Sequence, residues 1–301
     1  MDMTRYFACH QQWIAGQEAG LGELTAAAAN AAARRATEAE LRAVVERCLR
    51  GYEEYATTRR AMAPEDGAAF FAPPWCTTFE KAVLWLGGCR PSLSIRLLYC
   101  VSSEGLEAQL QEFLSGHGRA GGDDMIRPTG SGLLGINAMQ LEQINNLHGR
   151  TIHEEGILSE RLASLQEKIA DRPLLPIVRE REQERARAAA LPRGSASSNG
   201  LVGRFAAMGL AGVDAEVDAA MESYTAGLAK LLEEADQLRL STTRELATEI
   251  LTPRQAVEML AAAKQLHLSI CDWSRRKEGA QSALLPPAAT ASSSSSGRPN
   301  A

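Results

Sequence analysis

The sequence is poor in aromatic and β-branched residues. Phe, Trp and Tyr together make up 5% of its 301 residues, and Val and Ile are sparse beside Ala and Leu. Strands favour β-branched and aromatic residues, whereas Ala and Leu lose little freedom in a helix, so this bias predicts an all-α protein. No stretch alternates polar and apolar residues with a period of two over a useful length, and we therefore expect no sheet.

Long apolar runs and paired cysteines are also absent. No run approaches the roughly 20 apolar residues that a membrane-spanning helix needs, and the N-terminal residues show no basic head followed by an apolar core. The six cysteines include no CxxC pair, which predicts reduced thiols in an intracellular protein. We expect a protein of the nucleus, and also of the cytoplasm, that does not associate with membranes.

Basic residues are too few and too scattered for a DNA-binding helix. The net charge is −5 at pH 7, and the arginines and lysines cluster only at Arg34–Arg35, Arg59–Arg60 and residues 275–277. A basic region that contacts bases needs a denser array on one helix that leads into a leucine zipper. The sequence therefore predicts no direct contact with DNA.

Signatures of catalysis and of metal binding are likewise missing. There is no GxSxG motif and no cysteine in a recognisable nucleophile context. The glycine-rich residues 116–132 lack the GK[ST] ending of a phosphate loop. In HGRTIHEE the two histidines, His148 and His153, are five residues apart and do not match HExxH. A polar patch inside a helix bundle is the favoured interpretation, and we expect neither enzymatic activity nor a bound metal.

Apolar residues spaced three and four apart predict a multi-helix bundle. Helix-start signals stand at Thr37 with Glu40, a capping box, and at Thr252 with Pro253. The stripes cover residues 7–24, 36–63 and 76–88, and heptad patterns predict long helices over residues 134–169 and 217–238.

Composition sets the expected domain limits. One domain is expected over residues 5–279, with an internal linker, charged and then rich in Gly and Ser, over residues 174–208. Residues 280–301 are of low complexity and are expected to form a disordered tail. The segment APEDGAAFFAPP, which ends at Pro74, reads as a loop because it carries Pro and Gly.

Residues 73–98, PPWCTTFEKAVLWLGGCRPSLSIRLL, are hard to explain as generic helix. Two glycines are expected to end a short helix, an arginine to hydrogen-bond its exposed carbonyls, and a proline to begin the next helix. Two tryptophans would supply large anchors to a core that has few aromatic residues. The residues of this motif are Trp75, Glu80, Trp85, Gly87, Gly88, Arg90 and Pro91.

This motif resembles the signature of the plant Delay of Germination domain, which also occurs in the C-terminal half of TGA-type bZIP transcription factors. Residues 7–24, 163–173 and 238–273 are similar to further segments of that family, in the same order. No basic region and zipper precede residue 7, so the chain resembles the stand-alone Delay of Germination-like proteins.

The resemblance implies a non-enzymatic regulatory protein of plants. Such a protein would act in seed dormancy or abscisic-acid signalling by binding and restraining type-2C protein phosphatases. The alternative is a transcription regulator with the sequence-specific DNA-binding association of the TGA-type relatives. A homodimer and bZIP factors stay open as partners.

The N-terminal helix is the expected phosphatase-binding element. It lies outside the WLGG motif and ends in small residues, so its aromatic side chains are expected to be partly free for a groove. The residues expected to bind are Phe7, Trp13 and Ile14. The alternative is that these residues pack into the bundle.

A haem site is expected from the resemblance at His267 and Cys271. In the best-known branch of the family, haem binding is attributed to two histidines one helical turn apart. In this chain a cysteine holds the second position. Imidazole and thiolate both ligate haem iron, and residues four apart share one face of a helix. The alternative interpretation is an apolar helix face that carries a core histidine and a core cysteine.

Overall fold

The computed structural model describes residues 3–101, 135–171 and 199–284, together with residues 175, 179, 182, 183 and 186. Side chains from 199 to 216 and from 280 onward lie outside this description. The described residues are almost entirely helical, and no strand occurs among them. The prediction of an all-α bundle is confirmed.

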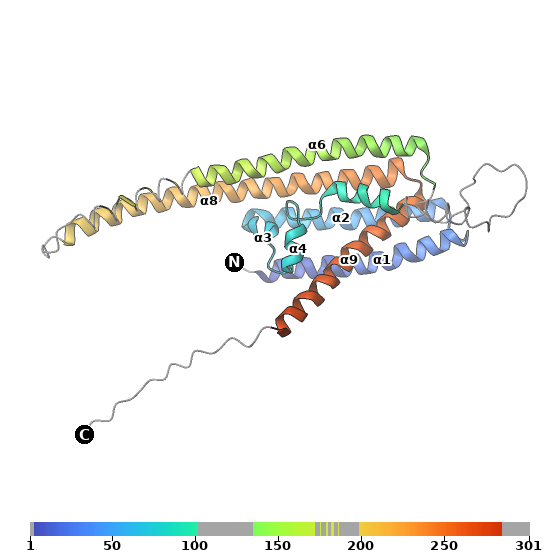
Figure 1. Cartoon of the computed structure of the whole chain (residues 1–301), viewed down its shortest axis with the longest axis horizontal. Helices are drawn as coiled ribbons and strands as arrows, with labels where there is room; N and C mark the ends of the chain where they lie inside the picture. Colours follow the sequence, from blue (N-terminus) through green and yellow to red (C-terminus); the bar gives the residue numbers. More distant parts are fainter. Residues whose placement is uncertain are drawn as a thin grey trace, which may run out of the picture.

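Two long antiparallel helices, α1 (Met3–Ala32) and α2 (Glu38–Asp66), form one layer of the bundle (Figure 1). The predicted capping box opens α2: the Thr37 backbone N–H donates to Glu40 at 2.7 Å, and the Glu40 N–H donates to the Thr37 hydroxyl at 3.3 Å. Helix α2 begins at this box because both otherwise unpaired N–H groups find acceptors there.

The prediction of a loop over residues 63–74 is wrong for most of its length, and only residues 72–74 lie outside a helix after Gly67. Helix α2 runs through Pro64 to Asp66, and α3 (Ala68–Phe71) follows after one residue. Met62, Ala63 and Phe70 are buried with Tyr6 of α1. The gain from burying these apolar side chains outweighs the local preference of Pro and Gly for a loop, and this gain is invisible to local sequence patterns.

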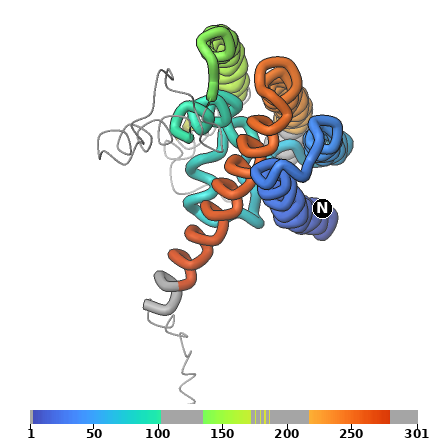
Figure 2. Tube along the Cα trace, turned by 90° about the vertical axis from the view of Figure 1, so that its right-hand side faces the viewer, coloured from blue at the N-terminus to red at the C-terminus, as the bar shows by residue number. Residues whose placement is uncertain are grey.

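A second antiparallel pair, α6 (Ala138–Ile169) and α8 (Asn199–Arg244), packs on the first through α2 (Figures 1 and 2). Both predicted heptad runs are helical, although α6 begins four residues late, because Asn137 caps it. Helix α8 overlaps the predicted linker, 174–208, from Asn199 onward. Most of the remaining linker residues lie outside the described part of the chain.

The chain then turns through a π-helical segment, η2 (Glu245–Ile250), into α9 (Pro253–Leu284). The predicted start of α9 is confirmed, since the Thr252 N–H donates to Gln255 Oε1 at 2.9 Å. Helix α9 crosses the bundle obliquely and packs on α1 and α2 (Figure 2). It includes the first five residues of the predicted tail, and residues 285–301 lie outside the described ranges.

The polar centre of α6 is a buried junction. Glu155 is fully buried, and its carboxylate accepts from Arg90 Nε at 2.6 Å and from the Ser92 N–H at 2.7 Å. Pro91 begins a helix that reaches at least residue 101, as predicted. The carboxylate therefore stands at the N-terminus of this helix, where the helix dipole favours a negative charge.

The structure of the WLGG segment, residues 85–88, differs from the predicted one. The preceding helix α4 (Thr78–Val83) ends before the glycines, and residues 85–88 form a tight turn in which Trp85 and Gly88 bond each other's backbone. The two central residues, Leu86 and Gly87, have φ of 45° and 71°, as in a type I′ turn. The glycines make a turn and do not end a helix.

Two arginines from distant helices satisfy the carbonyls of this turn. Arg59 of α2 donates to the Gly87 carbonyl at 2.7 Å, and Arg239 of α8 donates to the Leu86 carbonyl at 3.0 Å and to the Cys89 carbonyl at 2.7 Å. Both guanidinium groups pair with Asp236. Arg90, which was expected in this role, binds Glu155 instead.

Replacing Gly87 by Ala should destabilise the protein by about 2–4 kcal/mol. An added Cβ would lie 2.8 Å from Leu232 Cδ1, and the positive φ penalises any side chain. The matched change is Gly51→Ala, an exposed helical site with nothing within 4 Å, which should be neutral or stabilising by up to about 1 kcal/mol. Urea denaturation followed by circular dichroism measures both. Equal effects would show that the turn is not constrained.

Candidate functional site

The two residues of the expected haem site lie on one face of α9. His267 Nε2 is 3.9 Å from the Cys271 sulfur, as the spacing predicts. Cys271 is buried, and His267 is half-buried. His267 lies beside Trp13 of α1 and Cys271 beside Glu80 of α4, so three helices form the site.

Helix α1 covers His267 with aromatic side chains. The Trp13 ring stacks on Tyr55 of α2 at 4.0 Å between centroids and lies 6.3 Å from the His267 ring. One turn earlier, His10 lies 5.9 Å from Trp75. We refer to His10, Trp13, Tyr55, Trp75 and His267 as the aromatic–histidine cluster. Four of these residues lie on α1, α2 and α9, and Trp75 lies in the turn between α3 and α4, so no local sequence pattern links the five.

Helix α4 brings a carboxylate to Cys271. Glu80 closes a capping box with Thr77, whose N–H donates to it at 2.7 Å. The Cys271 thiol donates to the same carboxylate. Burial alone would raise the pKa of Glu80, but the hydrogen bonds from Cys271 and Thr77 lower it below its usual value. Burial and the bond to Glu80 raise the pKa of Cys271 to about 12, so this cysteine is a protonated donor.

Both histidines of the cluster are held neutral. Burial lowers the pKa of His10 to about 4, against the opposing effect of Glu80. Burial also lowers the pKa of His267, and the positive charges of Lys264 and Arg275 add to this effect. A proton on either ring would therefore be placed in a desolvated position near cations.

A buried lysine anchors α9 below the cluster. Lys264 donates to Gln17 Oε1 of α1 at 3.0 Å, and its ammonium lies 4.6 Å from the Tyr52 ring centroid of α2. Gly20 lets α1 approach closely here, because an added Cβ would lie 3.0 Å from Lys264 Cε. The polar contact fixes the register of three helices.

The pair as packed does not fit a haem. The His267 Nδ1 atom is buried without a hydrogen-bond partner among the described residues, and this feature favours a ligand. However, Nε2 lies 3.9 Å from the Cys271 sulfur, so this ring nitrogen contacts the thiol and is not directed at an open ligand position. The Trp13 ring, 6.3 Å from the His267 ring, packs beside it. Within the described ranges, no group of three His, Cys, Asp or Glu residues fits a metal ion either.

The expected phosphatase-binding residues differ in exposure. Phe7 is 41% exposed and touches Trp75 with its edge, at 5.8 Å between centroids. Trp13 belongs to the aromatic–histidine cluster, and Ile14 beside it is half-buried. Phe7 is thus the member that α1 presents to solvent.

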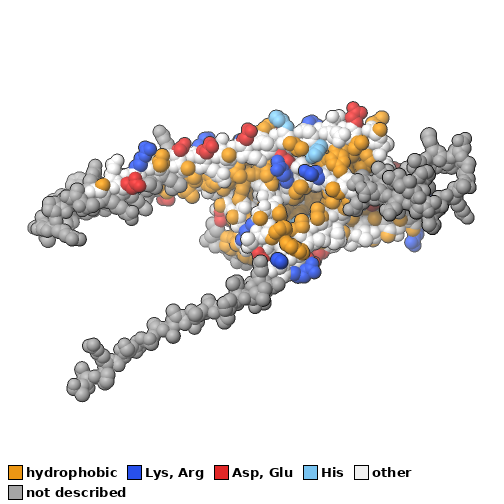
Figure 3. Space-filling view, viewed as in Figure 1, with side chains coloured by type: hydrophobic (Ala, Val, Ile, Leu, Met, Phe, Trp, Pro, Cys, Tyr) orange, Lys and Arg blue, Asp and Glu red, His pale blue; other side chains and the backbone are white. Residues whose placement is uncertain are grey.

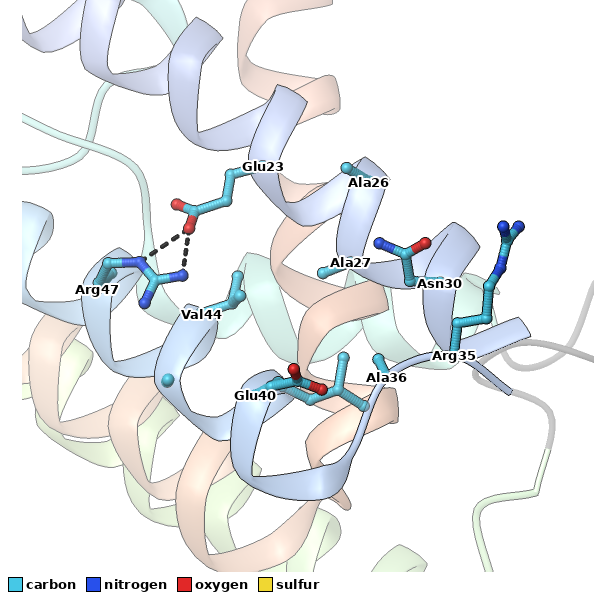
Figure 4. Close-up of a pocket in the computed structure, with 11 residues that line it drawn as sticks. Glu23, Ala26, Ala27, Asn30, Arg35, Ala36, Glu40, Val44 and Arg47 are labelled. Carbon is cyan, nitrogen blue, oxygen red and sulfur yellow. Dashed lines mark hydrogen bonds and ion pairs between the residues drawn. The ribbon is translucent and has the colours of Figure 1, made fainter. Parts of the chain in front are cut away.

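An open groove of about 370 Å³ lies at the far end of α1 and α2 (Figure 4). Its floor is formed mostly by small side chains, and the Arg47–Glu23 ion pair closes one side. No residue of the aromatic–histidine cluster lines it. The groove is therefore separate from the candidate site.

None of the described helices is long and apolar enough to cross a membrane.

The neutral histidines predict a pH-dependent stability. A histidine that titrates near 4 when folded and near 6.5 when unfolded binds fewer protons in the folded state. Stability should therefore fall as pH decreases from about 6.5 toward 4. His10→Gln should reduce the difference in unfolding free energy between pH 7 and pH 5, while His153→Gln, at an exposed position, should leave it unchanged. Urea titrations at both pH values measure this. An unchanged difference in His10→Gln would contradict the assignment.

Comparison with known proteins places the chain in a family. A family model, DOG1, described as "Seed dormancy control", matches residues 20–100. Protein DOG1-like 2 of Arabidopsis thaliana is 30% identical over 267 residues, which cover 89% of each chain. Protein DOG1-like 3 of the same plant is 29% identical over 90% of this chain and 84% of its own.

A more distant similarity extends to transcription factors. Transcription factor TGA2 of Arabidopsis thaliana is 25% identical over 84% of this chain and 58% of its own length. The names and descriptions across these relatives are regulatory and belong to plants. The chain belongs to the DOG1 family, and this confirms the resemblance that the WLGG motif indicated.

Proposed function

We propose that this protein is a non-enzymatic regulator that acts in seed dormancy or abscisic-acid signalling by binding type-2C protein phosphatases. A relative from Arabidopsis thaliana named Response to ABA and salt 1, 27% identical over 75% of this chain, supports the hormone part. The similarity to TGA factors supports action in the nucleus.

The observation that carries the proposal is an exposed aromatic residue on a firmly held helix. Tyr6, the neighbour of Phe7, is buried and donates to the Met62 carbonyl at 3.0 Å. Leu24 and the Lys264–Gln17 bond fix the rest of α1. Phe7 is therefore presented in a fixed position, which lowers the entropy lost when a partner binds it.

The remaining expected contacts act through packing. Trp13 stacks on Tyr55, so it stabilises α1 and presents Ile14 beside it. Removing all of residues 1–24 would expose the core that Leu24 and Tyr6 cover. A truncation would thus unfold the bundle, and single substitutions are the sharper test.

Phe7→Ser should weaken phosphatase binding about tenfold, because a central aromatic anchor contributes on the order of 1.4 kcal/mol or more. The matched control is Met139→Ser, which removes another exposed apolar side chain, 71% exposed, on α6. Calorimetric titration against a panel of purified plant type-2C phosphatases measures the affinity, and circular dichroism verifies the fold. Equal affinity of Phe7→Ser and the native chain for a phosphatase that binds would contradict the proposed surface.

Regulation of transcription is the second candidate, and the TGA similarity is what favours it. The relation would be through association with bZIP factors, since the chain itself carries a net charge of −5. Few phosphates can be neutralised by such a surface, and affinity for DNA falls steeply with salt.

The chain alone should therefore show no sequence-dependent complex with duplex DNA at physiological salt. An electrophoretic mobility shift assay with a TGA-type site and a scrambled duplex measures this. Sequence-dependent retention at about 150 mM salt would move the proposal to direct DNA binding.

A further inference from the structure

Two aromatic side chains lie together at the surface where α4 runs beside α9. Phe79 of α4 is 43% exposed, and Trp273 of α9 is 47% exposed. Their rings meet edge to face, 4.8 Å between centroids. Val83, one turn along α4, and Leu266, two turns before Trp273 on α9, are also exposed, at 46% each. We call these four residues the α4–α9 face.

Contacts between α4 and α9 on both sides of the ring pair hold this face in place. The Thr78 N–H of α4 donates to the Glu278 carboxylate of α9, and the Cys271 thiol donates to Glu80. These two bonds flank the ring pair in sequence on both helices. In a protein with 5% aromatic residues, a half-exposed pair held in this way is suited to anchor a partner, because aromatic residues are enriched among the residues that contribute most to binding.

Cations continue the same side of α9. Arg276 and Lys277 follow Trp273 by three and four residues, so they share its face. Both are exposed, and neither forms an ion pair with a described residue. Arg276 donates only to the backbone carbonyl of Asp272. Figure 3 shows hydrophobic side chains on α9 with Lys and Arg side chains beside them. An unpaired basic edge in a chain of charge −5 calls for an acidic partner.

We propose that the α4–α9 face binds an acidic amphipathic helix of a partner protein. The apolar ridge of that helix covers Phe79, Val83 and Trp273, and its carboxylates pair with Arg276 and Lys277. Apolar anchors at helical spacing that lie on a hydrophobic face are a common mode of recognition. This inference goes beyond phosphatase binding through Phe7 and does not depend on it.

The charges disfavour two other occupants. A second copy that met this face around a twofold axis would bring the same apolar and cationic groups of both chains together, and like charges oppose such contact. Anionic membranes are recognised by larger clusters, about four to eight Lys or Arg residues. Arg276 and Lys277, which form no ion pair within the described part of the chain, and the small apolar face beside them fit one helix better.

The test uses a fluorescein-labelled peptide of about four helical turns that carries Leu and Trp on one face and Glu elsewhere. Fluorescence anisotropy with the full chain should give a Kd on the order of 10 µM. Phe79→Ser/Trp273→Ser should weaken binding at least tenfold, and Arg276→Glu/Lys277→Glu should weaken it about fivefold and remove its salt dependence. The matched control is Met139→Ser/Leu141→Ser, at two exposed apolar positions on α6, which should bind like the native chain.

Control peptides and two further assays show which partner binds the α4–α9 face. A peptide with Lys in place of Glu, and one scrambled so that its apolar residues share no face, should not bind. No binding of the acidic peptide, or equal binding by Phe79→Ser/Trp273→Ser, overturns the proposal. Sedimentation of phosphatidylserine vesicles that the same double variant abolishes would assign the face to membranes. A dimer in analytical ultracentrifugation that this variant dissociates would assign it to a second copy.

Discussion

The bundle depends on how the carbonyls of the turn at residues 85–88 are satisfied inside it. Arg59 and Arg239 donate to four carbonyls of residues 85–89, and Asp236 pairs with both guanidinium groups. Arg59 is nearly fully buried. Without these donors the turn would bury unpaired carbonyls, and each would cost about 1–3 kcal/mol. Arg59 also packs against aromatic side chains, since its guanidinium group lies over the Tyr55 and Phe70 rings. A buried ionic network of this kind specifies one arrangement of α2 and α8 more than it stabilises the fold, because desolvation offsets most of the attraction between its charges.

Fixing this turn also fixes α4, which immediately precedes it. Helix α4 is short, so it could not hold its position alone. Held at its C-terminal end by the turn and at its N-terminal end by the Thr77–Glu80 capping box, it brings Glu80 to Cys271. The family resemblance places a histidine where this chain has Cys271. Beside Glu80, a thiol donates one hydrogen bond within a small volume and remains neutral. The site therefore works as a packing junction of α1, α4 and α9, with a neutral imidazole and a neutral thiol at its centre.

Local sequence patterns were sufficient for the helices and poor for the ties between them. The capping boxes at Thr37 and Thr252 were predictable because both partners of each bond lie within four residues. The same holds for the shared face of His267 and Cys271. Pro64 was misleading, since burial of its neighbours overrides its local preference. The partner of Arg90 was also missed. The expected acceptors for Arg90 were the nearby carbonyls at the end of the preceding helix. Its actual partner, Glu155, is 65 residues away and is one of several polar residues in a heptad pattern.

The aromatic–histidine cluster connects the exposed Phe7, the binding residue proposed above, to the packing of α1. Trp75 contacts Tyr6, Phe7 and His10 of α1, at 6.1, 5.8 and 5.9 Å between ring centroids. The exposed Phe7 is therefore supported by the same ring that contacts the half-buried His10. Protonation of His10 would place a charge against Trp75 in a desolvated position and would weaken the packing of α1 there. Any loosening of α1 would then reach Phe7 through one shared side chain. The exposed anchor on α1 is thus only as ordered as the neutral histidine one turn along the same helix.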